Sequence, residues 1–196
     1  HILRIDFEIS VTPQQKIPRF VNVVMVFDNK ITLIDTGIKG SEKIISDYIK
    51  KHKRDLSEID TIILSHAHPD HIGSAARLKE ITSCKVVAHE LEKTWIEDID
   101  AQNKQRPVPG FYDLVDTPVV VDEFLSSYQT MKLGDNVTIC IIESPGHSKG
   151  SLNILFEEDK ILFTADSIPL KNDIPNYDND LDLMKSLELI KGLKYN

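Results

Sequence analysis

The feature that most restricts the fold of this chain is a pattern that occurs twice, in residues 22–36 and again in residues 153–167. Each unit contains an apolar strand, an acidic turn, a second strand beginning with Lys-Ile, and then a carboxylate, Asp35 or Asp166. A helical pattern follows each unit, after a longer gap in the second case. Strands followed by helices, twice over, predict an α+β fold with two sheets covered by helices.

This repeat has two interpretations. Two β-hairpins can resemble one another by chance, in which case the pattern says nothing about function. A duplicated half would instead deliver one carboxylate from a strand end, Asp35 in the first unit and Asp166 in the second, toward one site. The sequence alone leaves both interpretations open.

Periodicity and turn residues place the other elements. Alternating or short apolar runs predict strands at 3–11, 21–27, 30–35, 61–64, 84–88, 130–133, 137–143, 152–156 and 161–165. Apolar stripes at helical spacing predict helices from Ser41 to the basic cluster ending at Arg54, over 72–81, over 91–98, and from 181 onward. Ser41 is expected to cap the first helix, and the prolines and polar residues from 13 to 18 to break the chain.

Composition predicts a single domain over residues 1–196. Residues 99–118 hold three prolines and little periodicity, so we expect an inserted, lid-like excursion there rather than core. The hydrophobic share of 41% and charged share of 28% are typical of globular domains, and no apolar run is long enough to cross a bilayer. A net charge of −8 argues against a phosphate-backbone binder, so neither a nucleic-acid nor a membrane partner is expected.

The termini and the cysteines bear on location. Cys84 and Cys140 lie in apolar segments, which predicts buried, reduced thiols and a cytoplasmic protein. The first residue is His1 rather than Met, so the chain looks trimmed or processed, and no signal peptide is visible.

Three histidines and an aspartate lie within residues 66–71, directly after the short apolar strand at 61–64. His66 and His68 are separated by one residue, so in an extended stretch both side chains can point to the same side. Pro69 stiffens the turn, and Asp70 and His71 then face a neighbouring position. Imidazoles and carboxylates are ligands that Zn²⁺, Fe²⁺ and Mn²⁺ accept, so this segment predicts a metal site.

The sequence His-Ala-His-Pro-Asp-His at 66–71 resembles the His-x-His-x-Asp-His signature of the metallo-β-lactamase-fold hydrolases. Asp-Thr-Gly at 35–37, Pro-Gly-His at 145–147 and Thr-Ala-Asp at 164–166 resemble three further elements of this family, in the family's order. The resemblance covers nearly the whole chain and is nearest to lactonase-like and glyoxalase II-like members. It implies an αββα sandwich of two mixed β-sheets flanked by helices.

The resemblance also implies two adjacent metal sites. It assigns His66, His68 and His147 to the first metal, Asp70 and His71 to the second, and Asp166 to a bridge between them. Asp35 would lie behind the ligands and steady one of the histidines, as acceptors of the second imidazole N–H commonly do. The expected cofactor is zinc, one or two ions per chain, with iron or manganese as alternatives.

One departure from the family concerns the sixth protein ligand, which is usually a histidine on a loop beyond the last helix. This chain contains no histidine after His147. The fold is therefore expected to lack its C-terminal end, to take a substitute ligand from beyond residue 196, or to have a natively weak second site.

The resemblance implies a hydrolase that opens a small acyl substrate, such as a lactone, thioester, ester or β-lactam, with a metal-bound hydroxide. Asp70 would orient the hydroxide and take a proton. Five aromatic residues are candidates for an apolar pocket wall, with core packing as the alternative: Trp95, Phe111, Tyr112, Phe124 and Tyr128. The partner is expected to be a small molecule, and a homodimer is possible.

Three other functions compete with this one. A phosphodiesterase or nuclease of the same fold would want a basic groove or an extra arm, and neither is apparent. A flavin-linked redox relative typically has Glu in place of the second histidine, whereas this chain has His68. A non-catalytic metal-binding or sensing protein is the third alternative, and metal analysis would discriminate it from the hydrolases.

Overall fold

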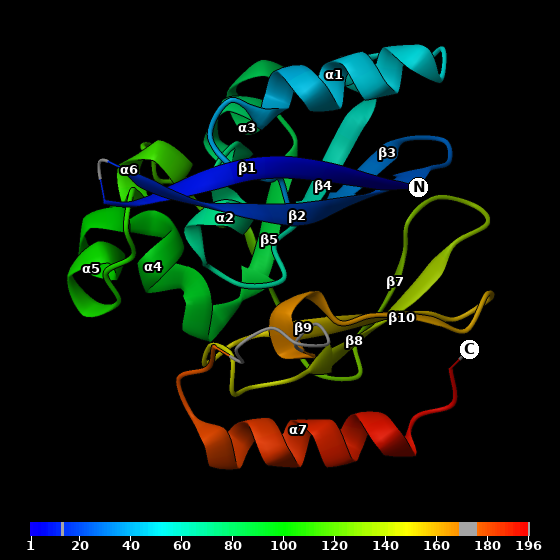
Figure 1. Ribbon diagram of the computed structural model, residues 1–196. Helices are drawn as coiled ribbons and strands as arrows, with labels where there is room; N and C mark the ends of the chain where they lie inside the picture. The colour runs from blue at the N-terminus through cyan, green and yellow to red at the C-terminus, as the bar shows by residue number, and fades with distance from the viewer. Residues whose placement is uncertain (13, 169–175, 196) are drawn as a thin grey trace.

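The computed structural model describes residues 1–12, 14–168 and 176–195, and it contains two β-sheets that lie face to face. Figure 1 shows four layers: helices, a first sheet, a second sheet, and a last helix. This arrangement confirms the predicted α+β sandwich. Six strands in the order β1-β2-β3-β4-β5-β6 form the first sheet, and four in the order β10-β9-β8-β7 form the second.

The strands of the first sheet are β1 (Ile2–Thr12), β2 (Gln15–Phe27), β3 (Ile31–Ile34), β4 (Ile59–Ile63), β5 (Lys85–His89) and β6 (Glu123–Leu125). Those of the second are β7 (Thr130–Lys132), β8 (Thr138–Glu143), β9 (Leu152–Phe156) and β10 (Ile161–Phe163). The first sheet is mixed, because β1, β2 and β3 pair antiparallel whereas β3, β4, β5 and β6 pair parallel. All pairs in the second sheet are antiparallel.

The helices are α1 (Ser41–Lys51), α2 (Pro69–Ile72), α3 (Ala75–Thr82), α4 (Lys93–Glu97), α5 (Ile99–Gln105), α6 (Phe111–Leu114) and α7 (Asp180–Gly192). The described residues also form the 3₁₀ turns η1 (Leu56–Glu58), η2 (Glu90–Glu92) and η3 (Ala165–Ser167). In Figure 1, α1 and α3 cover the outer face of the first sheet, and α7 covers the outer face of the second. None of the helices in the described ranges is long and apolar enough to span a membrane.

Alternation along β2 shows how the two hydrophobic cores arise. Val23 and Met25 belong to the core between the first sheet and its helices, whereas Val24 and Val26 belong to the core between the two sheets. Because side chains of a strand point alternately to opposite faces, a strand that is apolar at every position can serve both cores. Burial on both faces explains why β2 is a continuous apolar run near its end rather than an alternating one.

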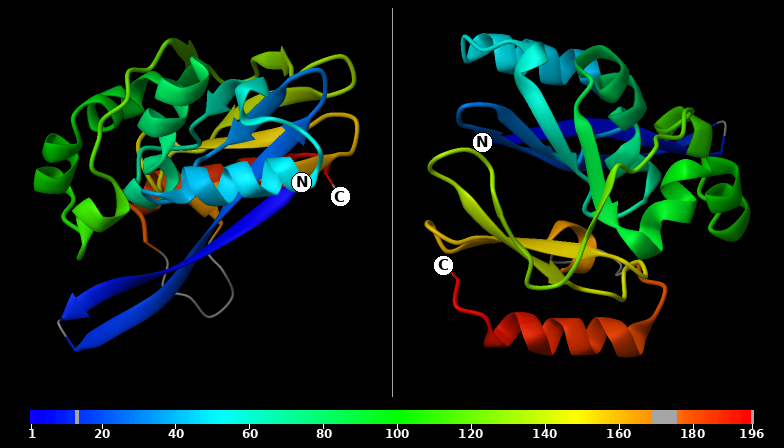
Figure 2. Two further views of the ribbon diagram at one scale, coloured as in Figure 1. Left: turned by 90° about the horizontal axis from the view of Figure 1, so that it is seen from above. Right: turned by 180° about the vertical axis from the view of Figure 1, so that it is seen from behind.

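Several predicted boundaries are wrong in detail. The predicted break over residues 13–18 is too long, because β2 already begins at Gln15 and Pro18 pairs opposite Glu8 of β1. Within the described part of the chain, β2 pairs with β1 alone at Pro18, since its pairing with β3 starts at Val24, so a missing N–H is tolerated there. Figure 2 shows this β1–β2 hairpin reaching past the rest of the sheet. The short strand β6 was not expected.

Two predicted helices also differ. The predicted cap of α1 is wrong: Gly40, at φ 85°, is the residue before the helix, and the buried hydroxyl of Ser41 has no hydrogen-bond partner among the described residues. The predicted helix over 72–81 begins later, as α3 from Ala75. Ile72 instead ends the separate short helix α2, which has Pro69 in its first turn. A proline fits that position because its missing N–H has no helical partner to serve.

Residues 99–118, expected as an excursion, form α5 and α6. Ile99, Phe111 and Val115 of this segment are buried in the core beneath the first sheet's helices. Of the two cysteines, Cys84 is buried and Cys140 is half-buried, and both are free thiols.

Candidate metal centre

The ends of strands from both sheets deliver the predicted ligands to one place. β3 and β4 are parallel neighbours, so Asp35 and the loop beginning at residue 64 leave the same edge of the first sheet. The backbone N–H of Asp35 donates to the carbonyl of Ile63 across this edge at 2.8 Å. His147 follows β8, and Asp166 follows β10, both from the second sheet. The site therefore lies between the sheets, where the strands end.

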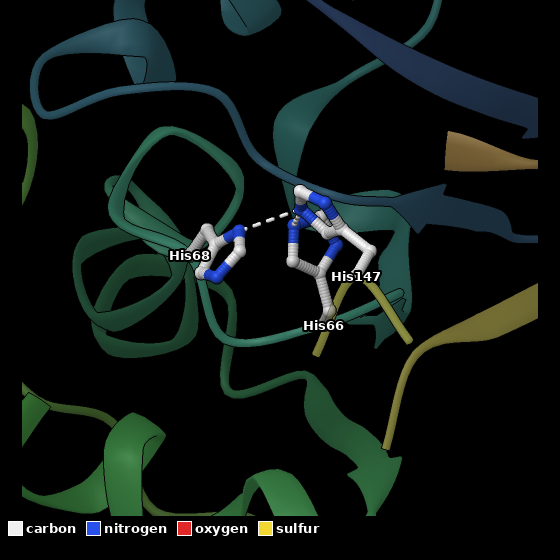
Figure 3. A group of neighbouring side chains, drawn as sticks. All are labelled: His66, His68 and His147. Carbon is white, nitrogen blue, oxygen red and sulfur yellow. Dashed lines mark hydrogen bonds between the residues drawn. The ribbon is translucent and has the colours of Figure 1, made fainter. Parts of the chain in front are cut away.

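Three imidazoles converge at this edge. Nε2 of His147 lies 3.2 Å from Nε2 of His66 and 2.7 Å from Nδ1 of His68. Figure 3 shows the three rings pointing toward one another, His66 and His68 from one loop and His147 from another. Tetrahedral Zn–N bonds of about 2.0–2.1 Å place ligand nitrogens roughly 3.3 Å apart, which the distance of 3.2 Å between His66 and His147 matches. The distance of 2.7 Å between His147 and His68 is that of a hydrogen bond between the two rings.

Hydrogen bonds on the far side of two rings show which nitrogens carry protons. The carbonyl of Asn176 only accepts, so Nδ1 of His147, 2.5 Å away, must donate to it. The Ser65 hydroxyl donates to Asp35 at 2.7 Å, so it accepts from Nδ1 of His66 at 2.9 Å. In their neutral forms both rings thus direct an Nε2 lone pair into the space between them. Two lone pairs 3.2 Å apart repel each other, and a metal ion held between them would remove that repulsion, so these residues fit a metal ion.

A second set of ligand atoms adjoins the first. Among the described residues, ligand atoms of His66, His71 and Asp166 also lie within 4.8 Å of one another. Nε2 of His71 is 3.5 Å from Oδ1 of Asp166, and Nε2 of His147 is 3.6 Å from Oδ2 of Asp166. Asp166 thus lies between the two sets, the position expected of a bridging carboxylate.

The structure places Asp70 differently from its neighbours. Its Oδ2 lies 3.8 Å from Nε2 of His71, and Asp70 belongs to neither set of ligand atoms found among the described residues. The side chain is 26% exposed and lines the cavity described below. The carboxylate is therefore close to the second set and accessible to a molecule that enters the cavity.

Asp35 connects two of the histidines from behind. Its carboxylate is fully buried and accepts from the Ser65 N–H at 2.8 Å and the Ser65 hydroxyl at 2.7 Å. It also contacts Nδ1 of His71 at 2.8 Å. Because the Ser65 hydroxyl in turn holds His66, one carboxylate orients a histidine of each set. A left-handed backbone at Asp35, with φ 63°, aims the side chain inward at the end of β3.

The histidines of the two sets have different charge states in the metal-free protein. Burial lowers the pKa of His66 and of His68 well below the usual value, and neighbouring imidazoles lower both further. Burial also lowers the pKa of His147, against opposition from Asp166. These rings are therefore neutral near pH 7, the form that binds a metal.

The charges around His71 act in the opposite direction. Burial disfavours its charged form, but the carboxylates of Asp166, Asp35 and Asp70 outweigh this and raise the pKa of His71 well above its usual value. Burial raises the pKa of Asp70. Although burial opposes it, the charge on His71 holds the pKa of Asp166 well below its usual value. A metal at the second set would displace the proton of His71.

Two residues that the sequence did not reveal support the ligand loops. The carboxyl group of Glu92, at the end of η2, accepts hydrogen bonds from both loops that carry the first ligand set, His66, His68 and His147. Arg106, just after α5, donates to the backbone carbonyl of His147 at 3.1 Å and pairs with Asp178. No sequence motif marks either residue, because their partners are mostly backbone atoms distant in the chain.

A cavity of about 350 Å³ opens above the ligands. Among the described residues, its apolar walls come mainly from the β1–β2 hairpin and the end of β10, including Ile9, Phe20 and Phe163, and Arg19 and Arg106 are the arginines that line it. Of the two alternatives for the five aromatic residues, the pocket wall is wrong: the described lining residues do not include Trp95, Phe111, Tyr112, Phe124 or Tyr128. Phe111 packs in the core instead, and the indole of Trp95 stacks on His68 at 6.3 Å between ring centroids.

Curated relatives match parts of the chain. A hydroxyacylglutathione hydrolase from Bradyrhizobium sp. is 30% identical over 107 residues, which cover 55% of this chain and 33% of that protein. A flavo-diiron protein, FprA2, from Clostridium acetobutylicum is 31% identical over 149 residues, covering 74% and 33%. The chain thus spans about a third of the length of these relatives.

Solved structures share the fold over most of the chain. BJP-1, a subclass B3 metallo-beta-lactamase of Bradyrhizobium japonicum, superposes with a TM-score of 0.72 at 26% identity, covering 89% of this chain and 69% of that one. A metallo-beta-lactamase family protein from Thermus thermophilus reaches a TM-score of 0.75 at 18% identity, covering 96% and 69%, and shows the fold alone. The family model described as the metallo-beta-lactamase superfamily matches residues 17–196, and the chain belongs to that superfamily.

Proposed function

We propose that this chain is a metal-dependent hydrolase that uses an activated water to open a small acyl substrate. The observation that carries the proposal is the convergence of the His66, His68 and His147 ring nitrogens at the floor of a cavity, next to His71 and Asp166. The alternatives of a structural metal site or a polar loop do not account for a ligand set that faces an open cavity.

The residues divide into distinct roles. His66, His68 and His147 would hold the first ion, and His71 would hold a second with Asp166 shared between them. A divalent cation there would lower the pKa of water to about 7 and polarise the substrate carbonyl. Imidazole-rich sites suit zinc, and iron or manganese are the other candidates.

Asp70 is the residue that we expect to handle the proton. Its carboxylate is partly exposed to the cavity and lies 3.8 Å from the ring of His71, close enough to contact a water held beside the second set. It would orient the water and accept its proton, and then return that proton to the leaving group. Asp35 would keep His66 and His71 in the tautomers that present Nε2 to the ions.

The substrate class follows from the cavity and the relatives. A volume of about 350 Å³ with apolar walls and two arginines suits a small organic molecule. Thioesters are our first choice, because hydroxyacylglutathione hydrolases are among the relatives of this chain. Lactones, esters and β-lactams are the other acyl candidates.

The test is a panel assay with the chain loaded separately with zinc, iron and manganese. We expect hydrolysis of at least one thioester, lactone, ester or β-lactam, and loss of that activity in Asp70→Asn with metal retained. Hydrolysis of phosphodiesters alone would favour a phosphodiesterase. A metal-loaded protein inactive on every substrate class would favour a binding or sensing role.

A further inference from the structure

Glu92 is a buried carboxyl group that the proposed reaction does not use. Its side chain is only 2% exposed, although it carries two oxygens that need partners. Oε2 accepts from the backbone N–H of Ala67 at 2.8 Å. Oε1 accepts from the Ser148 hydroxyl at 2.8 Å and from the backbone N–H of Gly150 at 2.6 Å. Each oxygen therefore serves a different loop.

The two loops belong to different sheets. Ala67 lies between His66 and His68 on the loop that follows β4 of the first sheet. Ser148 and Gly150 follow His147 on the loop between β8 and β9 of the second sheet. The distances of 3.2 Å and 2.7 Å between ring nitrogens depend on how these loops sit against each other. Glu92 bridges them beside the three histidines.

Close packing around Gly150 supports the bridge. A Cβ atom at Gly150 would lie 2.9 Å from Cγ of Glu92 and 2.7 Å from Nδ1 of His89. His89 is itself fixed, because it accepts from the backbone N–H of Leu91 and caps η2, the turn that carries Glu92. The absence of a side chain at Gly150 is thus what lets the loop reach the carboxyl group.

We propose that Glu92 is a positioning residue that sets the spacing between His147 and the His66–His68 pair, and thereby the metal affinity of the first site. The proposal rests on the metal centre of the proposed function but not on its hydrolytic reaction. Groups that orient metal ligands typically change metal affinity by about 10–100-fold when they are replaced. Glu92 does not contact the ligand rings themselves. It accepts from backbone and hydroxyl donors on both loops, so its loss removes no metal ligand but lets the two loops move apart.

The test compares Glu92→Gln with Glu97→Gln. Glutamine has the same shape as glutamate but only one accepting oxygen, so its NH₂ group would face a donor on one of the two loops. Glu97, on the adjacent α4, also accepts a backbone hydrogen bond, from Val121 N–H at 3.0 Å, and neither Glu97 nor Val121 belongs to the two ligand loops. The second variant therefore controls for the loss of a carboxylate–backbone bond.

Cobalt binding to the first site is measured by absorbance during competition with a chelator, and the melting temperature of each metal-free variant is recorded. We expect Glu92→Gln to weaken cobalt binding about 10–100-fold and to alter the ligand-field spectrum, while Glu97→Gln stays within about threefold of the unmodified protein. Cobalt affinity and spectrum unchanged in Glu92→Gln would overturn the proposal. Equal weakening in both variants would also overturn it, because it would show a general effect of stability.

Ser148→Ala keeps the proposal testable if Glu92→Gln does not fold. It removes one of the three donors to Glu92 and should weaken cobalt binding by a few-fold; unchanged affinity would contradict the bridge. If the unmodified chain binds no cobalt, this proposal and the proposed function both fail. If it binds cobalt but hydrolyses no substrate, only the proposed function fails.

Discussion

The two repeated units end in carboxylates with different environments. Asp35, from the first unit, is fully buried and holds Ser65 and His71 by hydrogen bonds of 2.7–2.8 Å. Asp166, from the second, is 45% exposed and lies 3.5–3.6 Å from the rings of His71 and His147. Both carboxylates contact the same ring of His71, one at Nδ1 and the other near Nε2. Their similar sequence context therefore does not imply a similar role: Asp35 orients metal ligands from behind, whereas the Asp166 carboxylate can itself be a metal ligand.

The largest effect is expected from Asp35→Asn. Asparagine tolerates the left-handed backbone at this position, so the change tests the carboxylate rather than the turn. Its NH₂ group cannot accept from either Ser65 or His71, and a buried donor left unpaired costs about 1–3 kcal/mol. We expect a loss of about 2–4 kcal/mol in the free energy of unfolding, measured in urea on metal-free protein, and weaker metal binding at both sets. Unchanged stability with loss of one ion only would contradict the fixing role.

Asp166→Asn should separate the two sets with much less effect on stability. Because Asp166 is partly exposed, solvent screens part of its attraction to the buried His71, so we expect the free energy of unfolding of the metal-free protein to fall by less than it does in Asp35→Asn. Metal analysis after dialysis should show greater loss from the second set than from the first. Equal loss from both sets would argue against the bridging position.

The pH dependence of the metal-free protein should sharpen the comparison further. The pKa of His71 is raised above its ordinary value of 6.5, so the stability contributed by its charge is present below pH 6.5 and is lost as the pH rises through the raised value. The pH dependence of Asp166 runs in the opposite direction: its pKa is lowered, so its stabilisation is present above the ordinary value of 3.8 and is lost as the pH falls below that value. In the presence of a chelator, we expect the denaturant concentration at the unfolding midpoint to decrease as the pH rises above neutral. In Asp166→Asn this fall should be smaller, and an identical profile would contradict the pairing.

The smallest effect is expected in the turns of the two units. Lys160 has a left-handed backbone, with φ 55°, whereas Lys30 is not among the described residues with positive φ. Lys160→Gly should therefore raise the free energy of unfolding by up to about 1 kcal/mol, and Lys30→Gly should lower it by roughly 0.5–1 kcal/mol. Thermal melting of both variants measures this; changes of the same sign would show that the turns are alike.

The sequence predicted the parts of the site that are local in the chain. His66, His68 and His71 lie within six residues of the chain. The repeated strand pattern indicated where Asp35 and Asp166 would emerge, and the family resemblance at 145–147 indicated His147. The repeated hairpins were found for the same reason, because β2–β3 and β9–β10 are each built from adjacent residues.

The parts that sequence reasoning missed depend on contacts between distant residues. Glu92 binds Ala67 and Ser148, which are 25 and 56 positions away, and a backbone acceptor or donor leaves no pattern in the side chains. The aromatic residues proposed for the cavity wall do not line it, because residue type does not tell which way an aromatic ring faces. Phe20 lies just before the strand that was predicted to start at Val21, and it lines the cavity, whereas Phe111 is buried in the core.

The most direct test of the central claim is metal content by elemental analysis, before and after replacement of His68. The account predicts that the unmodified chain, purified and dialysed against metal-free buffer, retains about one or more ions, and that His68→Ala stays folded but retains fewer than about 0.5. Fewer than about 0.5 ions in the unmodified chain, or equal content in the folded variant, would contradict a metal centre built on His66, His68 and His147.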